Sequence, residues 1–68
     1  MKYAVIHCSN GTFKLDSEWT DEKQAIVNFH TICTTLWNAE DVDNAAVTMV
    51  NEKFVTVKIE YIKYQTQA

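Results

Sequence analysis

Residues 3–19 read YAVIHCSNGTFKLDSEW, and this stretch indicates a β-hairpin. Its centre, Asn10-Gly11, is a strong turn signal, because both central residues of a type I′ turn have positive φ, which Gly and Asn adopt most readily. With a two-residue loop, alternation along the strands gathers one apolar set on one face. That set is Ala4, Ile6, Cys8, Phe13 and Leu15. We expect this face to pack against the rest of the protein.

A helix is predicted within residues 20–38, running from Asp21 to Trp37 or Asn38. Thr20 is the expected N-cap, followed by two acidic residues where the helix dipole favours anions. Asn38 is expected to close the helix as a left-handed cap. Apolar residues recur at intervals of three and four and form a stripe suited to packing on a sheet. The stripe comprises Ala25, Ile26, Phe29, Ile32, Cys33, Leu36 and Trp37.

A second hairpin is predicted over residues 45–64, after an acidic connection. Asn51-Glu52-Lys53 is read as a three-residue loop. The pairs that this register makes are Met49 with Val55, Val47 with Val57 and Ala45 with Ile59, which would form an apolar face. Residues 65–68 are expected to fray.

These elements predict one α+β domain over residues 1–68, with the order ββαββ and one helix on one face of a four-stranded sheet. Residues 54–64 form the longest expected strand and residues 3–8 the most apolar one, so both favour central positions. Placing them side by side gives the strand order 2-1-4-3, which resembles the β-grasp of the small immunoglobulin-binding domains of proteins G and L. The resemblance lies in element order and implies no binding residue. A fully antiparallel order, 2-1-3-4, remains open.

Composition narrows the class of function. The net charge is −3, with six Lys and no Arg. The lack of Arg argues against nucleic-acid binding, because proteins of that class commonly use Arg to contact phosphates and bases. Charge is uneven, because residues 16–43 hold seven carboxylates and one lysine. There is no apolar run long enough for a membrane span and no signal peptide, so a cytoplasmic protein is expected. The use of Lys without any Arg, together with many Asn and Thr residues, favours a bacterial or phage source.

No catalytic or metal site and no cofactor are predicted. Structural zinc takes four ligands, whereas at most Cys8, Cys33 and His30 could converge. Two free thiols are the expected state, and a Cys8–Cys33 disulfide stays open. The acidic connection, residues 40–44, lacks the glycine and terminal glutamate of a calcium loop.

Two surfaces are candidates for binding. The first is the sheet face turned away from the helix, where aromatic and basic residues are expected together: Tyr3, Val5, His7, Lys14, Phe54, Thr56 and Lys58. The second is the helix flank at His30 and Trp37. The leading hypothesis is a non-enzymatic protein-interaction module that forms a homo-oligomer. The alternatives are weak single-stranded nucleic-acid binding on the sheet face and an acidic regulator or inhibitor that docks its helix side on a basic partner.

Overall fold

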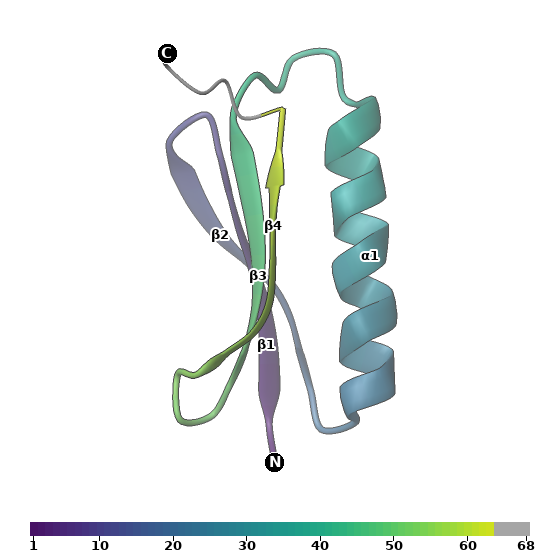
Figure 1. Cartoon of the computed structure of the whole chain (residues 1–68), viewed down its shortest axis with the longest axis vertical. Coiled ribbons are helices and arrows are strands. Elements are labelled where there is room, and N and C mark those ends of the chain that lie inside the picture. Colours follow the sequence, from purple (N-terminus) through teal and green to yellow (C-terminus); the bar gives the residue numbers. More distant parts are fainter. Residues whose placement is uncertain (64–68) are drawn as a thin grey trace.

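The structure is a computed structural model and describes residues 1–63. Its elements are β1 (Tyr3–Ser9), β2 (Thr12–Trp19), α1 (Glu22–Asn38), β3 (Ala45–Asn51) and β4 (Thr56–Ile62). The helix lies along one face of the sheet, and within residues 1–63 no element covers the other face (Figure 1). The predicted α+β class and ββαββ order are confirmed. Tyr64 and residues 65–68, assigned above to a strand end and a frayed tail, lie outside the described residues.

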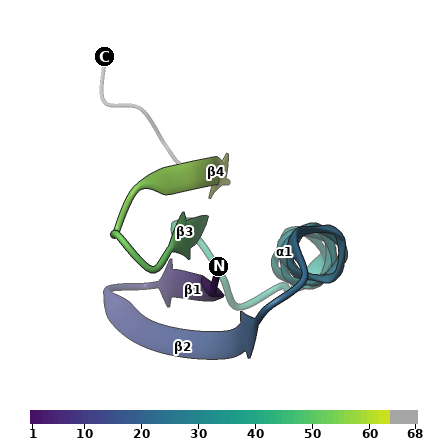
Figure 2. The same cartoon turned by 90° about the horizontal axis from the view of Figure 1, so that it is seen from below.

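The strands follow the order β2-β1-β3-β4, and all neighbours are antiparallel (Figure 2). The favoured β-grasp-like order was therefore wrong, and the antiparallel alternative is the one that forms. β3 lies between β1 and β4, and its apolar sequence suits this position, because Ala45, Val47, Met49 and Val50 are all buried there. β4 spans only seven residues and is exposed over most of its length, as suits an edge strand.

The first hairpin forms around the predicted turn, with Asn10 at φ 50° and Gly11 at φ 86°. Near the turn the register is the predicted one, from Ser9–Thr12 to Ile6–Leu15. A β-bulge then shifts the pairing, so that Val5 faces Ser17 where a regular ladder would give Asp16.

Gly11→Ala should destabilise the protein by about 1–2 kcal/mol, the usual cost of a left-handed conformation for a residue with a Cβ. A Cβ at this position would meet no atom within 4 Å, so backbone strain is the only source of the loss. Urea denaturation measures it. Gly11→Asn is the matched control, because Asn tolerates this conformation better and should lose less; equal stability of Gly11→Ala and the wild type would contradict the argument.

The helix packs on the sheet face that the sequence assigned to solvent. Val5 is fully buried, whereas Phe13 and Leu15 are 80% and 53% exposed. The predicted core face of the first hairpin was therefore wrong, and that face is turned away from α1. The core joins buried residues of the helix and sheet: Val5, Ala25, Phe29, Cys33, Leu36, Val42, Ala45, Val47, Met49 and Ile62.

The second hairpin has a different register from the predicted one. Ala45 pairs with Ile62, Val47 with Glu60 and Met49 with Lys58. Part of the cause is a longer turn, in which the Asn51 side-chain oxygen accepts hydrogen bonds from the backbone N–H groups of two turn residues, Lys53 and Val55. A β-bulge between Met49 and Val50 then shifts the pairing by one further residue, and the turn and the bulge together bring Ile62, in place of Ile59, into the core.

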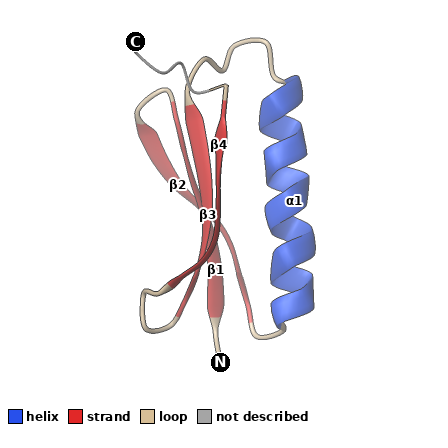
Figure 3. Cartoon of the chain, viewed as in Figure 1, coloured by secondary structure: helices blue, strands red, loops and turns tan. Residues whose placement is uncertain are grey.

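The helix bounds agree with prediction to within one residue, but both caps differ (Figure 3). Asp21, one residue after Thr20, is the N-cap and accepts the N–H of Lys23 at 3.0 Å. At the other end the chain leaves in extended conformation at Ala39, and Asn38 does not have the positive φ of a left-handed cap. No helix within residues 1–63 is long and apolar enough to cross a membrane.

Candidate interaction surface

The sheet surface turned away from α1, here called the outer face, is almost free of charge. Alternation along each strand and the observed pairing define its members. They are Phe13, Leu15 and Glu18 on β2; Ala4, Ile6 and Cys8 on β1; Ala46, Thr48 and Val50 on β3; and Thr56, Ile59 and Tyr61 on β4. Glu18 is the single charged residue among these strand positions, and its carboxylate lies 3.1 Å from Lys2 Nζ.

Residue size varies across the outer face. In one row of paired residues across the four strands, the small Cys8 and Ala46 lie between the large Phe13 and Tyr61. Phe13, Leu15, Ile59 and Tyr61 are each at least half exposed. A hollow of about 130 Å³ lies among Ile6, Cys8, Phe13, Ala46, Thr48 and Ile59. Large apolar surfaces of this kind on a small chain mark interaction sites.

Both hairpin turns bend away from the helix at diagonally opposite corners of the twisted sheet (Figure 1), so the outer face is concave along the diagonal that joins them. An exposed aromatic ring stands at each end of it. Phe13 follows the first turn, and Phe54, 84% exposed, lies within the second. Phe54 also holds a left-handed backbone, with φ 61°. This conformation is strained for an aromatic residue, and such strain is often found at functional positions.

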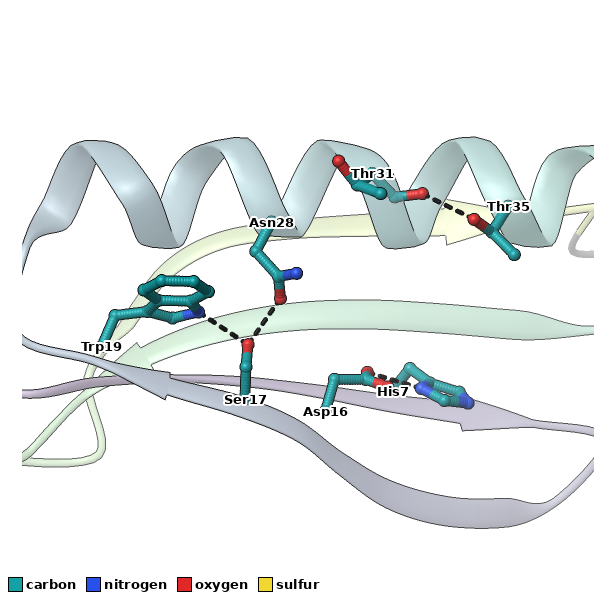
Figure 4. Close-up of polar contacts among 7 residues, drawn as sticks. All are labelled: His7, Asp16, Ser17, Trp19, Asn28, Thr31 and Thr35. Carbon is teal, nitrogen blue, oxygen red and sulfur yellow. Dashed lines mark hydrogen bonds and ion pairs between the residues drawn. The ribbon is translucent and has the colours of Figure 1, made fainter.

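The polar residues of the first hairpin gather on the helix side of the sheet (Figure 4). His7 Nδ1 and Asp16 Oδ2 are 2.6 Å apart, with side chains 13% and 11% exposed. Ser17 donates to Asn28 Oδ1 of the helix at 2.5 Å and accepts from Trp19 Nε1 at 2.7 Å. Because of the β-bulge, the side chains of Asp16 and Ser17, which are adjacent in sequence, both lie on the helix side of the sheet. Polar side chains therefore tie β2 to the helix and leave the outer face apolar.

Most of the predicted sheet surface lies on the wrong side. Five of its members occupy helix-side positions: Tyr3, Val5, His7, Lys14 and Lys58. Tyr3 packs against the core, and Val5 belongs to it. Thr56 does lie on the outer face, and Phe54 lies in the turn beside it. In the first hairpin the pairing near the turn was predicted correctly, and the error was the choice of the face that packs against the helix.

The predicted helix flank forms one face of α1, because His30 and Trp37 are seven residues apart. His30 is exposed, and its ring stands edge-on to Phe29 with ring centroids 5.4 Å apart. Trp37 is 47% exposed and donates its indole N–H to Glu60 Oε2 at 2.8 Å. Trp37 thus fastens the end of the helix to the edge strand β4.

The acidic helix surface suggested by the sequence does not form. After Glu22 in the first turn, the helix sequence to Asn38 holds no carboxylate. The acidic residues of segment 16–43 lie in β2, at the helix start and in the connection after the helix. The helix surface exposed to solvent is neutral, with Val27 and several threonines.

The two cysteines lie on opposite sides of the sheet. Cys8 is on the outer face, whereas Cys33 is buried between helix and sheet. The convergence of Cys8, Cys33 and His30 considered for zinc is therefore not formed, nor is a disulfide between the two thiols. Burial, aided by the negative charge of Glu60, raises the pKa of the Cys33 thiol from 9.0 to about 11.

A thiol reagent at pH 8 should modify Cys8 in the folded protein and spare Cys33, because the thiolate is the reactive form and Cys33 is 4% exposed. Peptide mass spectrometry after a short labelling pulse measures this; Cys33 should react once the chain is unfolded in urea. Since folding raises the Cys33 pKa, the stability gained from the protonated thiol is present below pH 9.0 and lost as the pH rises towards 11. Cys33→Ala should lack this part of the alkaline destabilisation.

Sequence reasoning missed the residues that dominate the outer face. Phe13 and Leu15 were assigned to the core, as was Ile59, and Tyr61 was not singled out. A usable signal was the composition of β1, where Val5 and Ile6 are both apolar, so either face of the first hairpin could have met the helix.

Comparison with protein families, with characterised proteins and with solved structures gives no significant match for this chain. Its function is therefore argued from the outer face.

Proposed function

We propose that this chain is a non-enzymatic protein-interaction module whose working surface is the outer face. The observation that supports this proposal is a nearly uncharged apolar sheet surface that nothing in residues 1–63 covers. A sheet in a small domain normally gains stability by burying one face and exposing a polar one. An apolar second face costs solubility unless a partner covers it, since burial of apolar surface drives most protein association.

The other features of the chain agree with this proposal. The side chains of His7 and Asp16 pair with each other on the helix side of the sheet, and both are largely shielded from solvent. Both cysteines are free, which suits a reducing cytoplasm. The nucleic-acid alternative receives no support from the outer face, because Lys14 and Lys58 occupy helix-side positions.

Affinity capture from cell lysate with three baits tests the proposal. The baits are the wild type, Ile59→Lys on the outer face and Val27→Lys on the exposed side of the helix. Ile59 and Val27 are 50% and 66% exposed, so both variants should fold. We expect proteins retained by the wild type and Val27→Lys, after nuclease treatment, to be lost with Ile59→Lys. Equal capture by all three baits would refute the role of the outer face.

A further inference from the structure

We propose that the partner of the outer face is the same face of a second copy, which gives a twofold homodimer with stacked sheets and both helices outside. This inference rests on the proposed function, because it names the occupant of the same surface. Charge, surface shape, sheet twist and area each bear on it.

Charge favours contact between two outer faces. Each copy has a net charge of −3, and residues 16–43 hold seven carboxylates against one lysine. Contact through the ends of the helix would bring these carboxylates together. The outer face offers only Glu18 among its strand positions, and Lys2 lies 3.1 Å from it. Two copies can therefore meet there without opposing unpaired like charges.

The outer face carries both a projecting ring and a hollow. A twofold interface uses the same patch on both copies, so a patch that contains both shapes can complement itself. Phe13 is 80% exposed and borders the hollow of about 130 Å³. An apolar cavity of about 150 Å³ admits a benzene molecule. The ring of Phe13 from one copy is thus suited to the hollow between Cys8 and Ile59 of the other, and the twofold axis repeats the contact.

The twist of the sheet decides how the two sheets cross. The two hairpin turns lie at diagonally opposite corners of the sheet and bend away from the helix (Figure 1), which is the shape of a twisted sheet. Two sheets with the same twist follow each other's surface when their strands are nearly aligned, at about 30°, and this is the aligned class of sheet packing.

Area places the dimer among weak complexes. Four strands span about 19 Å and seven residues about 23 Å, which gives about 440 Å² in projection. Projecting side chains and the two turns enlarge the accessible surface towards the ~800 Å² that each partner buries in a standard interface. An interface at the lower end of this range fits a dissociation constant of micromolar order.

Sedimentation equilibrium of the purified protein, from about 1 μM to about 1 mM, brackets the expected affinity. We expect a monomer–dimer equilibrium with no larger species, since a twofold contact closes on itself. Ile59→Lys should weaken it by about 100-fold or more, because the symmetric interface would hold two unpaired lysines. Phe13→Ala should weaken it by about 30-fold, as for an aromatic anchor that fills a hollow of the partner. Val27→Lys should leave it unchanged. Circular dichroism confirms that each variant is folded.

The Cys8 thiol gives a second readout that needs no substitution. Its alkylation should slow as protein concentration rises through the dissociation constant, because the dimer covers it. A wild type that stays monomeric throughout, or a dimer that survives Ile59→Lys, would overturn the inference. A monomer that nevertheless captures proteins lost with Ile59→Lys would overturn the dimer alone. A monomer without any such partner would overturn the proposed function as well.

Discussion

Phe29→Ala should leave much of the protein unfolded at room temperature. Phe29 is 2% exposed and lies in the core between α1 and the sheet. Removal of a buried Phe ring costs about 3–5 kcal/mol, whereas a chain of this length has about 3–10 kcal/mol of stability in all. Circular dichroism during urea titration should show the unfolding midpoint moved towards zero denaturant.

Phe13→Ala is the matched control, because it removes the same side chain from a site that is 80% exposed. At protein concentrations low enough to keep the chain monomeric, its free energy of unfolding should stay within about 0.5 kcal/mol of the wild type. If the two variants lost equal stability, the assignment of the core to the Val5 side of the sheet would be wrong.

Ile62→Lys should abolish folding, whereas Ile59→Lys should be tolerated in the monomer. Both residues lie on the edge strand β4, but Ile62 is fully buried and Ile59 is 50% exposed. A lysine at position 62 would place an unpaired charge in the core, which costs several kcal/mol and approaches the total stability of the domain. A lysine at position 59 would reach solvent on the outer face.

This pair also separates two registers of the second hairpin. If Ala45 paired with Ile59, as the three-residue loop implied, Ile59→Lys would be the unfolding variant. Because Ala45 pairs with Ile62, Ile62→Lys should be the variant that unfolds, and Ile59→Lys should stay folded. Amide proton dispersion in an NMR spectrum of each variant distinguishes a folded from an unfolded chain, so one experiment decides between the registers.

The features that were predictable from sequence are those that depend on neighbouring residues. The Asn10-Gly11 turn has a local steric cause, and the helix stripe that includes Ala25, Phe29 and Cys33 has a local period. Both were found, and the helix bounds differ by a single residue.

Features that depend on distant partners were not predictable. Val5 and Ile6 are both apolar, so alternation in β1 could not tell which face meets the helix. The bulge turns Asp16 and Ser17 to the same side, where each meets a partner on another element, His7 on β1 and Asn28 on the helix. The central position of β3 can be seen only when the burial of all four strands is compared. The prediction relied instead on the apparent length of residues 54–64, which was misleading.

The strand order also governs how the chain can assemble. Each hairpin pairs residues close in sequence, and such pairings form within microseconds. The pairing of β1 with β3 is different, since it joins Ser9 to Ala45 and Tyr3 to Asn51 across the entire helix. Closing that loop costs chain entropy before the core repays it. The molecule therefore consists of two hairpins joined along one non-local pair of strands, and we expect the pairing of β1 with β3 to be the last and slowest step of folding.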